Sequence, residues 1–128
     1  MDASPVIARN FPWCPENDDM SFGGRLHEEG FWCCQQYWLL ELALHRLCSD
    51  PPSREPYWRV FKIFSDCSAK FGYHFDPNDG CEIRNVRREE IYDARERFQL
   101  VFEGFFEGTM PPKDCFEPVN PLLMDSSN

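Results

Sequence analysis

Positive charge is scarce in this sequence. Its 128 residues include 13 lysines and arginines against 22 aspartates and glutamates, which gives a formal net charge of −9. A protein this acidic repels the phosphate backbone of DNA and RNA, so direct nucleic-acid binding is not expected. The same charge favours solubility and attracts a basic partner.

Long hydrophobic runs are also missing. The most apolar stretch, residues 37–44, contains Glu41 and is far shorter than the roughly 20 residues of a membrane-spanning helix. Residues 1–5 lack the basic start and the apolar run of a secretory signal, and the last residues carry no lipidation box. We therefore expect a cytoplasmic protein that does not bind a membrane.

The cysteines do not fall into pairs at metal-ligand spacing. There are seven of them, an odd number, and no C-x-x-C motif occurs. Structural zinc sites need paired thiolates a few residues apart, and disulfide frameworks are typical of small exported domains. His45 and Cys48 share a helical spacing, but they supply only half of such a site. We expect reduced thiols that pack as small hydrophobic side chains, with no metal and no cofactor.

Aromatic residues, by contrast, are abundant. They make up 16% of the chain, and hydrophobic residues make up 42%. A chain this apolar is not disordered, and at this length it buries a substantial core. Apolar residues recur three and four apart in three segments, which predicts helices at residues 31–49, at residues 56–70, and between Asn85, a candidate N-cap, and Gly108.

A shorter helix is predicted between Ser21 and Gly30. Serine is a favoured N-cap, and glycine commonly ends a helix in the left-handed conformation. Residues 2–19 and residues 113–128 have no helical period and are rich in proline and acidic side chains. We expect these two end segments to be extended.

Together these segments predict a mostly α protein, a single-domain bundle of three main helices plus a short one, with irregular N- and C-terminal arms. The domain is expected to span residues 1–128, with a body at residues 9–116 and an extended tail at residues 117–128. Phe116 and Leu122 are expected to pack the tail onto the body.

Three of the predicted helices have distinct faces. The helix at residues 31–49 is apolar on most sides, which is typical of a central helix, and its narrow polar stripe holds Glu41, His45 and Arg46. In the next helix Phe61 recurs with other apolar residues at helical spacing. The outer face of the last helix carries Arg88, Arg95, Glu96 and Glu103.

Two patterns come close to a chemical site without completing it. Adjacent Cys33 and Cys34 lie at the start of a predicted helix, where a thiol pKa is lowered, but no third orienting group can be named. The segment at residues 76–80 looks like a calcium loop, yet Cys81 and Arg87 stand where the EF-hand pattern needs Gly and Glu. Packing thiols and a turn are the better interpretations.

Acidic residues occur in adjacent pairs at 18–19, 28–29 and 89–90. Solvated charge is the ordinary explanation of each pair, but pairs that gather on one small surface form a patch for a basic partner. Some aromatic residues near helix ends are candidate anchors for such a partner, because aromatic side chains dominate interface hot spots: Trp13, Phe22, Phe31 and Trp32. Most of these four are expected to lie in the core or to cover it.

The order of short motifs along residues 9–116 resembles that of small acidic bacterial immunity proteins from polymorphic-toxin and contact-dependent growth inhibition systems. The motifs that carry the resemblance are RNFP at 9–12, SFGGRLHE at 21–28, YWLLE at 37–41, VFKIF at 60–64, HFDPNDG at 74–80 and IYDARERF at 91–98. The cysteines and the last dozen residues are not features of that family.

This resemblance implies a cytoplasmic protein without catalytic activity that binds the C-terminal toxin domain of one cognate effector and blocks it. Such toxins are often nucleases, whose grooves are basic because they hold phosphates. An inhibitor of charge −9 suits such a groove. From charge and expected exposure, the candidate contacts are Asp18, Asp19, Glu28, Glu29, Asp76 and Asp79.

Two other interpretations stay open at this point. A metal- or thiol-dependent enzyme or redox sensor would use Cys33, Cys34, His45 and Cys48, and would show bound zinc or a fast-reacting thiol. A structural subunit of a larger assembly would dock through its aromatic ends, and would form a stable partner complex.

Overall fold

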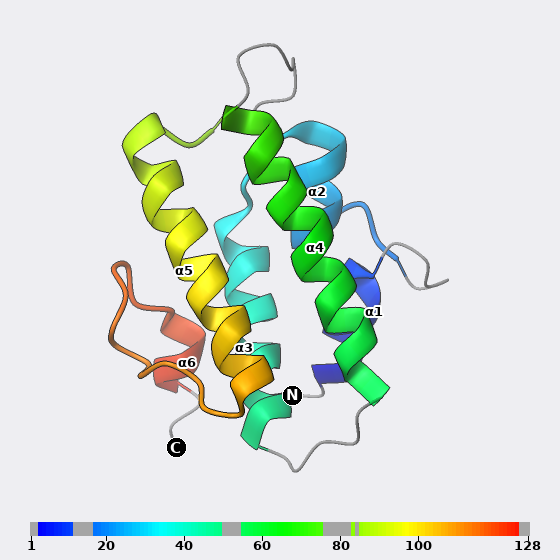
Figure 1. The fold of residues 1–128 in the computed structure, drawn as a ribbon, viewed down its shortest axis with the longest axis vertical. Coiled ribbons are helices and arrows are strands. Elements are labelled where there is room, and N and C mark those ends of the chain that lie inside the picture. The colour runs from blue at the N-terminus through cyan, green and yellow to red at the C-terminus, as the bar shows by residue number, and fades with distance from the viewer. Residues whose placement is uncertain (1–2, 12–16, 50–54, 76–82, 84, 126–128) are drawn as a thin grey trace.

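A computed structural model describes residues 3–11, 17–49, 55–75, 83 and 85–125. These residues form six α-helices and no strand, so the predicted mostly α bundle is confirmed. In Figure 1, α4 and α5 lie side by side in front of α3, with α1 and α2 on one side and α6 on the other. The helices are α1 (Ala3–Asn10), α2 (Phe22–Glu29), α3 (Cys34–Ser49), α4 (Glu55–Phe75), α5 (Arg88–Glu107) and α6 (Pro121–Asp125).

Helix α3 is the centre of the bundle and contacts α1, α2, α5 and α6. Its residues Tyr37, Leu40 and Leu44 are buried, as expected for a helix that is apolar on most sides. The core around it is aromatic: the Phe98 ring centroid lies 4.5 Å from that of Phe102. Burial of each such side chain contributes roughly 1.5–3 kcal/mol, so the aromatic content accounts for much of the stability.

The capping signals near α2 are confirmed. The Ser21 hydroxyl accepts a hydrogen bond from the Gly24 N–H at 3.1 Å. Gly30 ends the helix in the left-handed conformation, with φ of 62°. Gly108 ends α5 in the same way, with φ of 91°. At these two ends only glycine avoids the steric cost of a Cβ at positive φ.

Three predicted helix boundaries are wrong by a few residues. Helix α3 begins at Cys34 instead of residue 31, and α4 continues to Phe75. Helix α5 has Arg87 as its N-cap residue, not Asn85. The Asn85 side chain instead exchanges two hydrogen bonds of 2.7 Å with the backbone N–H and C=O of Trp32. Asn85 therefore binds the backbone of a residue far away in the sequence and does not cap α5.

The end segments are not wholly extended, which corrects the predicted arms. The first forms α1, whose Ala3, Ile7 and Ala8 are buried against the bundle. An eight-residue helix is marginal on its own in water, so its stability comes from contacts with α3 and α4 that the sequence does not display.

The tail predicted as extended at residues 117–128 likewise contains a helix, α6, which packs on α3. Leu123 is buried, and the half-buried Phe116 packs against the core as predicted. Buried Asn120 donates a hydrogen bond to the Trp38 carbonyl at 3.0 Å. These contacts hold the tail along α5, where it forms one wall of the groove described below.

Two side chains lie on unexpected faces. Glu41, assigned to the polar stripe, is only 2% exposed because Arg97 pairs with it inside the bundle. Phe61, assigned to an apolar face, is 50% exposed and stacks on Trp58, with ring centroids 6.4 Å apart. No helix among the described residues is long and apolar enough to span a membrane.

Candidate functional site

Two of the predicted acidic contacts come together. Asp19 and Glu28, both exposed, line a hollow of about 340 Å³ between α2 and α4. The same hollow includes Asp66 of α4, which pairs with Lys62 at 3.0 Å, and His27 of α2. Three carboxylates at one opening form a small acidic surface, which is the arrangement that the sequence predicted for part of the patch.

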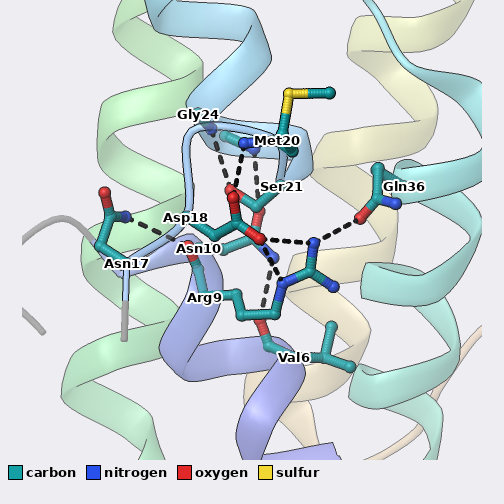
Figure 2. A network of polar contacts seen from close by, with 10 residues as sticks. Val6, Arg9, Asn10, Asn17, Asp18, Met20, Ser21, Gly24 and Gln36 are labelled. Carbon is teal, nitrogen blue, oxygen red and sulfur yellow. Dashed lines mark hydrogen bonds and ion pairs between the residues drawn. The ribbon is translucent and has the colours of Figure 1, made fainter. Parts of the chain in front are cut away.

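Asp18, in contrast, is engaged within its own loop. Its Oδ1 accepts from the Met20 N–H at 2.8 Å, and its Oδ2 accepts from Arg9 Nε at 3.1 Å. These hydrogen bonds, with the Met20 N–H first, lower the pKa of Asp18. Figure 2 shows Arg9 between Asp18 and Gln36, so this carboxylate ties the loop to α1 and α3.

Helix α1 fixes the start of α2 beside this loop. The Asn10 Oδ1 accepts from the Gly23 N–H at 2.8 Å, and the Asn10 Nδ2 donates to the Val6 carbonyl at 2.9 Å. Asn10 is buried. A first-turn N–H of a helix has no partner inside the helix, so Asn10 satisfies a donor that would otherwise be buried alone. The position of Asp19 therefore depends on a helix that sequence reasoning missed.

The remaining predicted contacts differ in their surroundings. Glu29 is exposed, and its Oε2 lies 2.8 Å from the Nε of Arg25, one turn earlier on α2. Asp76 and Asp79 lie outside the described residues. Within the described part of the chain, the predicted patch is thus reduced to Asp19, Glu28 and the unpredicted Asp66.

His27 lies beside this hollow with a lowered pKa. Loss of solvent around the imidazole is the main cause, and Lys70 and Lys62 of α4 act in the same direction. The negative charges of Asp66 and Glu28 act in the opposite direction and raise the pKa of His27. A histidine that is neutral at neutral pH adds no positive charge to the hollow, where Asp66 already has Lys62 as its partner.

A larger acidic groove, of about 740 Å³, runs between α5 and the segment at residues 109–117. We call it the α5 groove. Five carboxylates line it: Asp93, Glu96, Glu103, Glu107 and Glu117. The sequence placed Glu96 and Glu103 on an outer face, but nothing local signalled that the tail would return beside them.

The charge of the α5 groove is largely uncompensated. Among the described residues, Asp93, Glu96, Glu107 and Glu117 belong to no ion pair. Arg97 lines the groove as well, but its charge is balanced by buried Glu41. The groove therefore presents a strong negative potential to solvent.

The α5 groove also offers apolar contact area. Leu100 is 39% exposed, and Met110 and Pro111 lie in the same lining. Gly104 permits the tail to approach α5, because a Cβ there would lie 2.8 Å from Cδ of Pro111. An apolar floor between carboxylates suits a partner that carries both basic and apolar side chains.

The candidate aromatic anchors differ in burial, and Phe22 and Trp32 lie in the core or pack against it, as expected for most of them. Phe22 is fully buried, Phe31 and Trp32 are half-buried, and Trp13 lies outside the described residues. The exposed aromatic pair is Trp58 and Phe61 on α4. A regular helical period does not reveal which of its faces a neighbouring helix covers, which is why the sequence missed this pair.

The thiols do not form a metal centre in the described structure. Cys33 and Cys67 are buried as predicted, whereas Cys34 and Cys115 are exposed, and all four are free. Partial loss of solvent raises the pKa of Cys34, which is opposite to the lowering expected of a thiol at a helix start. No group of three or more His, Cys, Asp or Glu residues in this part of the chain is placed to hold a metal ion.

Comparisons of the chain with family models, with curated protein sequences and with solved structures gave no match.

Proposed function

We propose that this chain is an immunity-type inhibitor that neutralises one cognate toxin domain by binding a basic surface of that toxin through the α5 groove. The observation that carries the proposal is the concentration of five carboxylates in one concave surface with an apolar floor. The motif order along residues 9–116 supports the same function class, and the net charge of −9 supports a basic partner.

The physical basis is complementarity with a phosphate-binding groove. A nuclease toxin holds its substrate with lysine and arginine side chains, so its active-site surface is positive. A negative groove attracts such a surface over a distance and accelerates association. Once the surfaces meet, apolar contact through Leu100 and Met110 slows dissociation. Occupation of the toxin's basic groove would exclude its substrate.

The acidic hollow at Asp19 and Glu28 is a second, separate candidate surface. Figure 1 places α2 on one side of the bundle and the tail segment beside α5 on the other. We assign the main contact to the α5 groove because it is larger and holds more unpaired carboxylates. The hollow keeps the role predicted from sequence, as an acidic surface that adds to long-range attraction.

The first experiment is native mass spectrometry of the chain purified from cells that also express its adjacent gene, the candidate for the toxin. A 1:1 complex without added metal mass is expected. A metal-loaded chain without a partner would contradict the proposal and favour the thiol- or metal-dependent alternative. Survival of cells that express the active toxin supplies the functional readout.

Charge reversal then locates the contact. Glu96→Lys is expected to slow association with the toxin about tenfold or more at low salt, with the difference shrinking as salt is added. Glu89→Lys is the matched control, because Glu89 is also exposed on α5 but does not line the groove. Asp19→Lys tests the hollow in the same assay. Equal effects of Glu96→Lys and Glu89→Lys would show that net charge alone matters and would overturn the assignment to the groove.

A further inference from the structure

A smaller pocket, of about 330 Å³, opens beside the α5 groove and shares Asp93, Arg97 and Glu117 with it. Aromatic residues contribute much of its lining: Trp32, Tyr37 and Trp38. We call it the aromatic pocket. The shared residues make the pocket and the groove neighbours, so one partner could contact both.

The walls of the aromatic pocket are held in place. Asn85 fixes the Trp32 backbone with two hydrogen bonds of 2.7 Å, across 53 positions of sequence. The Tyr37 ring centroid lies 5.1 Å from that of Trp32 and 5.8 Å from that of Trp38. Trp32 and Trp38 are only half-buried, so part of each indole remains available. Rigid aromatic walls cost little entropy when a ligand binds.

The chemistry of the aromatic pocket favours a cation. Asp93 and Glu117 are exposed in its lining, and neither belongs to an ion pair in the described structure. Glu90 adds a third carboxylate, which already pairs with Arg87 at 3.1 Å. The positive charge of Arg97 is balanced by Glu41 outside the pocket lining. Carboxylates beside indole faces attract a cation both by charge and by the ring quadrupole.

The pocket already shows how its aromatic wall holds a guanidinium. The Cζ of Arg97 lies 4.7 Å from the Trp38 ring centroid. Arg97 also lies near the Tyr37 ring, with its Cζ 5.8 Å from the ring centroid. A planar guanidinium stacks on aromatic faces and pairs with carboxylates in two-pronged geometry, which an ammonium does not do.

We propose that the aromatic pocket receives an arginine side chain of the partner that binds the α5 groove. This inference rests on the proposed function for the identity of the partner, and on the pocket alone for the identity of the side chain. Arginine is a frequent hot-spot residue at interfaces, and insertion between carboxylates and indoles would slow dissociation of the complex.

The free chain tests the pocket without a partner. The probe is N-acetyl-arginine methylamide, titrated while the indole N–H signals of Trp32 and Trp38 are followed by NMR. The matched control is the citrulline analogue, which has nearly the same shape and no charge. We expect saturable shifts with the arginine probe and none with citrulline. Equal response to both, or no saturable shift, would overturn the proposal, and equal binding of the lysine analogue would overturn the assignment to arginine.

Variants connect the signal to the pocket. Asp93→Asn combined with Glu117→Gln is expected to weaken probe binding at least about fivefold, because both exposed carboxylates lose their charge. Glu89→Gln combined with Asp114→Asn removes two exposed charges outside the pocket and is expected to leave binding within about twofold. If both double variants weaken binding equally, the probe is responding to net charge and the pocket assignment fails.

The two proposals fail in different ways. If the chain neutralises the toxin but the arginine probe gives no saturable shift, the inhibitor function stands and the arginine pocket is wrong. If the probe binds the pocket but no toxin complex forms, the arginine site stands and the toxin is the wrong partner.

Discussion

Arg97 and Glu41 form a buried ion pair in which the Nε and Nη2 groups each donate a hydrogen bond of 2.9 Å to a different carboxylate oxygen. The pair joins α5 to α3 across 56 positions of sequence. Arg97 also donates to the Pro118 carbonyl, and Asn120 donates to Glu41 at 3.4 Å. The tail wall of the α5 groove therefore depends on this pair.

Arg97→Met is expected to lower the free energy of unfolding by about 3–5 kcal/mol, because it leaves the buried carboxylate of Glu41 without its cation. Combining it with Glu41→Leu is expected to recover most of the loss, since no buried charge then remains unpaired. Urea unfolding of the two variants measures both effects. A double variant no more stable than Arg97→Met would contradict this account.

Glu29→Gln tests an exposed ion pair for comparison with the buried pair of Arg97 and Glu41. It breaks the exposed pair with Arg25, and exposed pairs contribute at most about 1 kcal/mol. The same urea experiment is expected to show a change near its detection limit.

Asn10→Ala is expected to cost about 1–3 kcal/mol, because it leaves the buried Gly23 N–H at the start of α2 without an acceptor. Asn17→Ala is the control: Asn17 also donates to a backbone carbonyl, that of Arg9, but it is exposed, so water replaces it. Amide hydrogen exchange at Gly23 is expected to accelerate only in Asn10→Ala. Equal costs for the two variants would show that burial is not the cause.

Alanine substitutions at two helical glycines are expected to have opposite effects. A Cβ at Gly24 would lie 2.5 Å from the Asp18 carbonyl oxygen, so Gly24→Ala must displace the acidic loop, at about 1–3 kcal/mol. A Cβ at Gly72 would meet nothing within 4 Å, so Gly72→Ala is expected to stabilise α4 by about 0.5–1 kcal/mol. Thermal unfolding of both variants measures the sign, and a stabilising Gly24→Ala would disprove the close contact.

Acidification is expected to destabilise the protein through two histidines. In the folded chain, loss of solvent lowers the pKa of His27 and of His45 below the ordinary histidine value of 6.5. The unfolded chain then binds protons more readily, so this stabilisation is complete above about pH 6.5 and is lost as the pH falls below it. The urea midpoint is expected to be lower at about pH 5.5 than at about pH 7.5. Replacing both residues with glutamine is expected to reduce that difference, and an unchanged difference would exclude them as its source.

The parts of the fold that the sequence predicts are those governed by neighbours along the chain. Ser21, Gly30 and Gly108 act on the backbone within a few residues, so their capping roles can be predicted from the sequence alone. Helix α1 cannot be predicted in this way, because a helix of eight residues is stable only through the helices on which it packs. Asn85 has a capping side chain, but a backbone 53 residues away provides its partner.

The candidate site divides in the same way. Asp19 and Glu28 were identified from charge, and the hollow between α2 and α4 brings them together. The α5 groove was not identified, because Glu117 comes beside Asp93 only when the tail docks. Glu41 looked like a solvated residue since its partner is on another helix. Charge patterns in a sequence thus indicate acidic surfaces but not their concavity.

The hydrogen bonds of Asn120 to Trp38 and Glu41 span 82 and 79 positions of the chain. A ribosome delivers α3 well before α5 and the tail, so during synthesis Glu41 waits without Arg97 or Asn120. Burying an unpaired carboxylate costs several kcal/mol, so the centre of the bundle closes at low cost only when Arg97 and Asn120 are in place. Residues that lie about 80 positions apart in the sequence must therefore come together before the central helix is fully buried.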